Sequence, residues 1–186
     1  MTTRNVAQTQ LILNELKQVI SLLDVTEMER AASLIVQSKR VFIAGAGRSG
    51  LMGRAFAMRL AHLGITAYVV GETTTPSIDK HDLLVICSGS GETRSLAAMG
   101  EKAKLLGASL LVLTTNPNST CGVLADGVIH IQAKAKEEQG NNESLQPMGS
   151  LFEQSLLISL DGLILTLMNQ MDMSAEQMFK RHANLE

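Results

Sequence analysis

The chain has 186 residues, 45% of them hydrophobic and 18% charged, and its formal net charge is −2 at pH 7. This length and hydrophobic content predict one domain, residues 1–186, with a full core. A single Tyr, no Trp and no basic stripe exclude the usual features of a nucleic-acid-binding protein.

The sequence contains no signal for export or membrane insertion. The N-terminus MTTRNVAQTQ is polar, unlike a secretory signal. The longest apolar run, residues 156–168, is too short to span a bilayer and carries Asp161. Cys87 and Cys121 lack CxxC or metal-ligand spacing, which favours reduced, buried thiols. We therefore expect a soluble, cytoplasmic protein without a metal site.

The pattern along the chain predicts an α/β fold. Apolar residues recur at helical spacing over 5–23 and 27–38, so two helices precede the first strand. Strands are then predicted at 41–45, 66–70, 82–87, 109–114 and 127–131, with helices at 49–63, 93–106 and 119–125. Strands made of consecutive Val, Ile and Leu are typical of a parallel sheet covered on both faces. We predict a doubly wound five-stranded parallel sheet flanked by helices, with N-terminal helices 1–38 and a core at 41–131.

The first strand leads into the glycine-rich stretch AGAGRSG, residues 44–50, and a helix follows at once. A tight turn at a helix N-terminus leaves backbone N–H groups unpaired and suits an anion, most often a phosphate. Alone the motif is weak evidence, because GxGxxG also matches the dinucleotide-binding fingerprint. Arg48 is the cation placed to meet an anionic or hydroxylated substrate. A surface ion pair of Arg48 with Glu72 or Glu92 is the alternative.

A second loop of the same construction, SGSGET at residues 88–93, follows the strand 82–87. Its hydroxyl donors, Ser88, Ser90 and Thr93, converge with a helix N-terminus, which suits three phosphate oxygens better than a pyrophosphate. Ser90 or Thr93 could in addition cap the helix. In a doubly wound sheet both loops lie beyond the carboxyl ends of the strands, where ligands bind.

The C-terminal part, residues 147–186, is predicted to be helical. The polar stretch 132–146 is interpreted as a solvated loop, with a lid over the crevice as the alternative. A long helix at 151–171 is apolar on nearly every side, so we expect it to be buried partly by the sheet and partly by another subunit. Ser174 is expected to cap a short final helix.

Two residues of this region are candidates for chemistry. Glu153 lies one turn inside the start of the long helix, where the helix dipole favours its charge and apolar surroundings oppose it. It is either a catalytic carboxylate or a first-turn charge that faces water. His182 lies four residues from the C-terminus and by position alone would be a tail residue.

The loops AGAGRSG and SGSGET, the segment QPMGSLFEQ and the ending HANLE together carry a resemblance. The chain resembles the sugar-isomerase (SIS) domain family and, within it, the 6-phospho-3-hexuloisomerases, from about residue 11 to Glu186. The resemblance implies a cytoplasmic, cofactor-free, homotetrameric enzyme that interconverts D-arabino-hex-3-ulose 6-phosphate and fructose 6-phosphate. It also raises a hexulose-6-phosphate synthase as a pathway partner.

The resemblance implies roles for individual residues. Glu153 resembles the base that moves a proton between C2 and C3 through an enediol. The phosphate cradle would consist of the hydroxyl groups of Ser49, Ser88, Ser90 and Thr93 and the N–H groups of Gly89 and Gly91. Arg48 or the N–H of Gly47 could polarise the enediolate oxygens.

His182 is the candidate for opening the ring of fructose 6-phosphate, because the 3-ulose cannot close a five-membered ring while O6 carries the phosphate. We expect a neighbouring subunit to donate it. Three other functions stay open. They are a non-catalytic sugar-phosphate sensor, an isomerase for arabinose 5-phosphate or sedoheptulose 7-phosphate, and an NAD(P) enzyme with Glu72 on the ribose.

Overall fold

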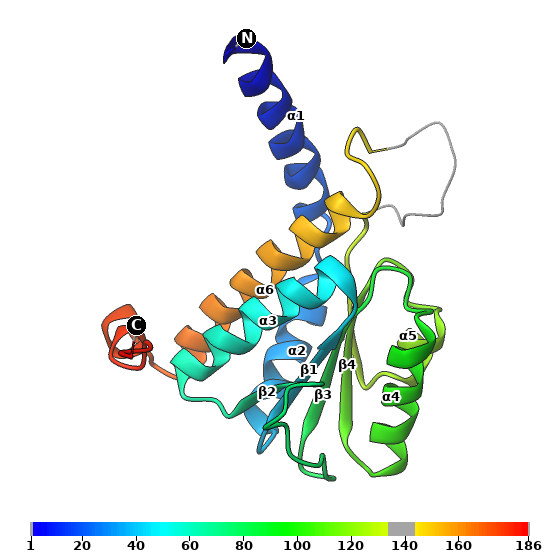
Figure 1. Ribbon diagram of the computed structural model, residues 1–186, viewed down its shortest axis with the longest axis vertical. Helices are drawn as coiled ribbons and strands as arrows, with labels where there is room; N and C mark the ends of the chain where they lie inside the picture. Colours follow the sequence, from blue (N-terminus) through cyan, green and yellow to red (C-terminus); the bar gives the residue numbers. More distant parts are fainter. Residues whose placement is uncertain (1, 134–143, 186) are drawn as a thin grey trace.

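The computed structural model describes residues 2–133 and 144–185. It is a three-layer α/β structure built on a five-stranded sheet in the order β2-β1-β3-β4-β5, and every strand pair is parallel (Figure 1). The strands are β1 (Val41–Gly45), β2 (Ala67–Val69), β3 (Leu83–Cys87), β4 (Ser109–Thr114) and β5 (Gly127–His130). The predicted doubly wound parallel sheet is therefore confirmed.

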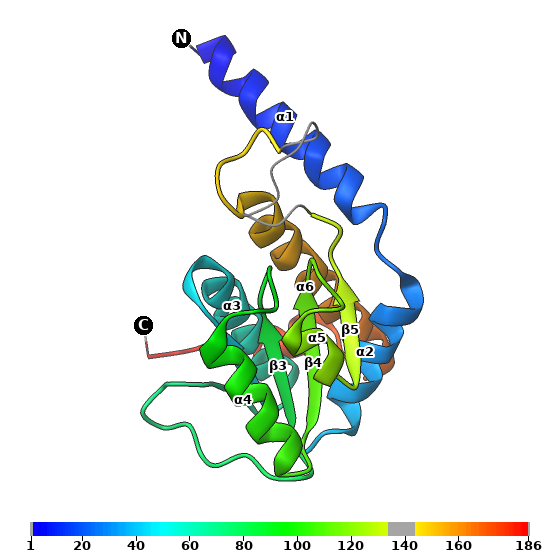
Figure 2. The same ribbon diagram turned by 90° about the vertical axis from the view of Figure 1, so that its right-hand side faces the viewer.

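Helices cover both faces of the sheet (Figure 2). The helices are α1 (Thr2–Ile20), α2 (Val25–Gln37), α3 (Gly47–Leu63), α4 (Arg94–Leu105), α5 (Thr120–Leu124), α6 (Ser150–Gln170) and α7 (Ala175–Phe179). One face packs against α2, α3 and α6, and the other packs against α4 and α5. The first half of α1 extends away from the body of the molecule (Figures 1 and 2).

Alternation along the strands divides the core in two. In β1, Val41 and Ile43 belong to the cluster under α3 and α6, while Phe42 and Ala44 belong to the cluster under α4. Successive side chains of a strand point to opposite faces, and here both faces are covered. This explains why the strands are apolar at consecutive positions.

The helix α6 has 21 residues and is by length and composition apolar enough to cross a membrane. A core helix passes the same test, and α6 packs against α1, α2 and α3 with Leu156, Leu163 and Leu167 fully buried. The chain covers α6 only in part, as expected, because Ile158 and Leu165 are exposed, and their burial by another subunit stays a prediction. The lid proposed for residues 132–146 falls mostly on 134–143, outside the described residues.

Strand order places the two glycine loops together. Residue Gly45 at the end of β1 is in register with Cys87 at the end of β3. The chain leaves β1 toward α3 on one face and β3 toward α4 on the other. In open parallel sheets such a reversal opens a crevice at the carboxyl ends, and ligands bind there.

Candidate functional site

The first loop owes its shape to two glycines that touch. A Cβ added to Gly50 would lie 2.5 Å from the carbonyl oxygen of Gly45, and one added to Gly45 would lie 2.8 Å from Cα of Gly50. The helix α3 thus begins directly at the end of β1. Its N-cap residue, Ala46, makes no side-chain cap hydrogen bond. The first N–H groups of α3 therefore lie at the carboxyl end of the sheet without an intrahelical partner.

The second loop, residues 88–93, is closed by its own hydroxyl groups. The Oγ atom of Ser88 accepts from the N–H of Gly91, and the Oγ atom of Ser90 accepts from the N–H of Glu92, both at 3.2 Å. Each hydroxyl accepts one bond and keeps its own proton to donate. The hydroxyls of Ser49 and Thr93 have no hydrogen-bond partner among the described residues.

The prediction that Ser90 or Thr93 caps α4 is wrong. Thr93 holds the N-cap position, but its side chain makes no cap hydrogen bond. The acceptor atom of Ser90 is used inside the loop. The first turn of α4 thus keeps its N–H groups for a ligand, as an anion site requires.

The start of α6 completes the site. The Nη1 atom of Arg48 donates to Oε2 of Glu153 at 2.9 Å and to Oγ of Ser150 at 3.2 Å. The ring of Phe152 lies against the second loop, since a Cβ on Gly89 would be 3.1 Å from it. Three segments that are distant in sequence, the two loops and the first turn of α6, therefore meet at one place.

The contacts of Arg48 rule out the alternative of a surface ion pair. Pairing of Arg48 with Glu72 or Glu92 is wrong, because Glu72 pairs with Arg54 and the carboxylate of Glu92 accepts from Thr120. The carboxylate of Glu153 is also not turned to open water, since its side chain is 18% exposed and lies against Arg48. Sequence alone did not indicate the contact of Ser150 with Arg48.

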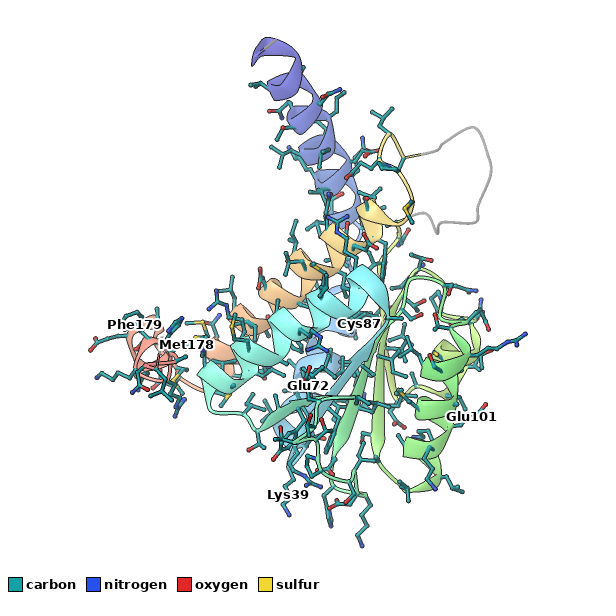
Figure 3. All side chains as sticks on the ribbon, viewed as in Figure 1. Lys39, Glu72, Cys87, Glu101, Met178 and Phe179 are labelled. Carbon is teal, nitrogen blue, oxygen red and sulfur yellow. The ribbon has the colours of Figure 1, made fainter. Side chains whose placement is uncertain are left out.

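The structure does not bring His182 to Glu153 in the same chain. The ring of His182 lies 5.3 Å from that of His62. His62 is fourteen residues beyond Arg48 on α3, or about 21 Å along the helix axis. Figure 3 shows Cys87 at the carboxyl end of the sheet, and Met178 and Phe179, close to His182 in sequence, near the far ends of α3 and α6.

The thiols of the two cysteines are buried, and the described residues form no metal-ligand cluster. Burial raises the pKa of the Cys87 thiol to about 12, so it remains protonated although it adjoins the second loop. Burial likewise raises the pKa of Cys121, and both cysteines are free and buried, as predicted. Within residues 2–133 and 144–185 no group of three or more His, Cys, Asp or Glu residues could hold a metal ion.

Comparison with known proteins identifies the class. The family model described as the SIS domain matches residues 34–158, from α2 into α6. This span includes both loops and Glu153. The chain belongs to the SIS domain family.

Two similar proteins carry the same activity in their names, and a solved structure led to the same inference. The chain is 46% identical to the 3-hexulose-6-phosphate isomerase of Bacillus subtilis, over all of this chain and 99% of that protein. It is 44% identical to the 3-hexulose-6-phosphate isomerase of Mycobacterium gastri, over 95% of this chain and 88% of that protein. A hypothetical protein of Methanococcus jannaschii, whose structure led to the same inferred function, superposes with a TM-score of 0.84 at 34% identity and covers 97% and 99% of the two chains.

Proposed function

We propose that this chain is a 3-hexulose-6-phosphate isomerase, which interconverts D-arabino-hex-3-ulose 6-phosphate and fructose 6-phosphate. The observation that carries the proposal is the meeting of Arg48 and Glu153 beside two loops rich in N–H and hydroxyl donors. The full-length similarity to proteins of that name supports the choice of substrate.

The proposed reaction is a proton transfer between adjacent carbons. The carboxylate of Glu153 takes the proton from C2 of the 3-ulose and returns a proton to C3 of the enediol. Arg48 and the N–H of Gly47 polarise the two enediol oxygens. This chemistry moves protons only and requires no cofactor.

The phosphate binds away from the reacting carbons. Its ligands in the proposal are the hydroxyls of Ser49, Ser88, Ser90 and Thr93 and the N–H groups of Gly89 and Gly91. Two of these hydroxyls, those of Ser49 and Thr93, have no partner among the described residues, and both loops adjoin a helix N-terminus. Binding energy from a remote phosphate holds the open chain in register and reduces the entropic part of the barrier.

Assay of the purified protein with fructose 6-phosphate in D₂O tests the proposal. We expect conversion to the 3-ulose and uptake of deuterium at C3 of fructose 6-phosphate, the position that Glu153 deprotonates in the reverse direction. Arabinose 5-phosphate and sedoheptulose 7-phosphate are the comparison substrates. Tight binding of fructose 6-phosphate without exchange would instead favour a sensor, and preferred turnover of another sugar would change the substrate.

The proposed enzyme is a cytoplasmic homo-oligomer, a tetramer by family resemblance, with a hexulose-6-phosphate synthase as pathway partner. The apolar side chains exposed on the adjacent helices α3 and α6 support burial by another subunit. They are Leu51, Met58, Ile158 and Leu165. Light scattering on a sizing column would measure the mass, and Leu165→Glu should reduce it.

His182 is proposed to come from a neighbouring subunit and to open the ring of fructose 6-phosphate. The distance from its own Glu153 supports this arrangement. We expect His182→Ala to reduce turnover of fructose 6-phosphate more than turnover of the linear 3-ulose. Mixed oligomers of His182→Ala and Glu153→Gln chains should regain part of the activity. Some of their sites then combine Glu153 of a His182→Ala chain with His182 of a Glu153→Gln chain. Equal losses in both directions would remove the ring-opening role.

A further inference from the structure

Glu92 is the acidic residue inside the second loop, where a negative charge should oppose a phosphate. Its carboxylate, however, is bound at both oxygens. The Oε1 atom accepts from the N–H of Thr120 at 2.8 Å, and Oε2 accepts from the hydroxyl of Thr120 at 2.6 Å. These two hydrogen bonds, from the side chain and the backbone of Thr120, hold the pKa of Glu92 below its usual value. The carboxylate is therefore ionised and fixed on the first turn of α5.

The carbonyl groups of Gly89 and Gly91, in the same loop, also point toward the segment that holds Thr120. The carbonyl of Gly89 accepts from the N–H and the hydroxyl of Thr115 and from the hydroxyl of Thr114, all at 2.9 Å. The carbonyl of Gly91 accepts from the N–H of Cys121 at 3.0 Å. Carbonyl oxygens would repel a phosphate, and here both glycine carbonyls are bound to the segment 114–121.

The loop and α5 are also in close steric contact. A Cβ on Gly91, whose φ is +67°, would lie 1.9 Å from Oγ of Ser119. Ser119 is buried and is the N-cap residue of α5, accepting from the N–H of Gly122 at 3.2 Å. The first turn of α5 thus forms the base on which residues 88–93 rest.

We propose that Glu92 is a positioning residue, whose carboxylate attaches residues 88–93 to the N-terminus of α5 and so keeps their donors turned toward the ligand phosphate. The inference rests on the proposed function, because it takes the second loop as the phosphate site. Thr120 is its partner, and Glu92 itself does not touch the ligand.

The proposal makes a prediction opposite in sign to simple electrostatics. Removal of a negative charge near a phosphate should tighten binding through space. Loss of the attachment should weaken it, because the end of the loop that Glu92 holds must then be ordered again when the ligand binds. The direction of the change in affinity therefore separates a positioning role from a mere surface charge.

The experiment measures binding of inorganic phosphate and fructose 6-phosphate by calorimetry in Glu92→Ala, Glu92→Gln, Thr120→Val and Thr120→Ser. We expect about tenfold weaker binding of both ligands for Glu92→Ala, since it loses two hydrogen bonds to a charged acceptor. Thr120→Val keeps the backbone bond and should show a smaller loss. Thr120→Ser keeps both donors. In Glu92→Gln the amide oxygen accepts from the N–H of Thr120 and the amide N–H donates to the hydroxyl oxygen of Thr120, so both variants should stay close to wild type.

Glu101→Ala is the matched control, because it removes the same charge from an exposed carboxylate on α4 that makes no hydrogen bond or ion pair with residues 88–93 (Figure 3). In turnover, Glu92→Ala should raise KM with kcat changed less than about threefold. Unchanged or tighter phosphate binding in Glu92→Ala would overturn the proposal. So would equal losses in Glu92→Ala and Glu92→Gln.

Failure of the proposed function gives a different result. Wild-type protein that binds both ligands but does not isomerise fructose 6-phosphate would refute the enzyme and leave the effect of Glu92 measurable. Wild-type protein that binds neither ligand would refute the phosphate loop and this inference with it. Melting temperatures of all variants identify any that fail to fold.

Discussion

Two arginine–carboxylate pairs stand at opposite ends of β1 and differ in what surrounds them. Just before β1, Arg40 binds Asp82 with Nε at 2.9 Å and Nη2 at 2.6 Å, and the Asp82 side chain is fully buried. Just after β1, Arg48 binds Glu153 through one nitrogen at 2.9 Å, and 46% of the Arg48 side chain is exposed. The first pair is largely buried and the second is accessible to solvent.

The difference separates an ion pair that stabilises the fold from one that we propose acts on the substrate. The Arg40–Asp82 pair joins the amino ends of β1 and β3, and Nη2 of Arg40 also donates to Asp79 and to the carbonyl of Ser77. Every charge there has a partner, so no ligand is needed. At the carboxyl end the partners come from separate elements, and free hydroxyl and N–H donors surround them. The same kind of ion pair therefore stabilises one end of the sheet and, in the proposed function, acts on substrate at the other end.

Substitution of Glu153 should give the largest effect. Glu153→Gln keeps an acceptor for Arg48 but cannot take a proton, so we expect kcat to fall by about 10³-fold with little change in stability or in phosphate binding. Deuterium exchange into fructose 6-phosphate measures the proton transfer directly, with Glu101→Gln as control. Exchange that survives in Glu153→Gln would mean that another group is the base.

Substitution of Asp82 tests the opposite end of β1. Asp82→Asn leaves Arg40 partly buried beside a neutral amide, so we expect the free energy of unfolding to fall by about 3 kcal/mol. The kcat of the folded variant should remain near wild type. Asp79→Asn is the matched control, because Asp79 is half exposed and contacts Arg40 at 3.3 Å, and we expect less than about 1 kcal/mol. Denaturant unfolding measures both, and similar losses would contradict the comparison.

The sequence predicted features that depend on neighbouring residues and missed contacts between residues far apart in the chain. The two loops and their strands were predicted because hydrophobic runs and glycine turns are local signals, and the parallel order then fixed their proximity. The partner of Arg48 was missed, since Ser150 and Glu153 are over a hundred residues away. Helix capping by Ser90 or Thr93 was also wrong, because Oγ of Ser90 accepts from the N–H of Glu92 inside the loop and the side chain of Thr93 makes no cap hydrogen bond.

Substitution of Arg48 should have an intermediate effect. Arg48→Gln removes the cation that polarises the enediolate in the proposal, and we expect a loss of about 10²-fold in kcat. Arg48→Lys restores the charge but not the guanidinium Nη1 atom that reaches both Ser150 and Glu153, so its loss should be smaller than that of Arg48→Gln. Stability should change by less than about 1 kcal/mol, because Arg48 is half exposed. A larger loss of stability than in Asp82→Asn would reverse the roles of the two pairs.

The smallest expected effect is on the free energy of unfolding at acid pH. Burial works against ionisation of Asp82, but the hydrogen bonds from Arg40 and from the N–H of Asp79 outweigh it, so the pKa of Asp82 lies below its usual value of 3.8. A carboxyl with a lowered pKa contributes its full stability above that usual value and loses it as the pH falls through the folded pKa. Asp82→Asn has no such titration.

The difference in unfolding free energy between wild type and Asp82→Asn should therefore be constant at neutral pH. Below pH 3.8 it should shrink by up to about 1.4 kcal/mol per pH unit, the value for one linked proton. Denaturant unfolding of both proteins between pH 7 and 2.5 measures it. A difference that stays constant over the whole range would show that Asp82 stabilises the fold by its shape and hydrogen bonds and not by its charge.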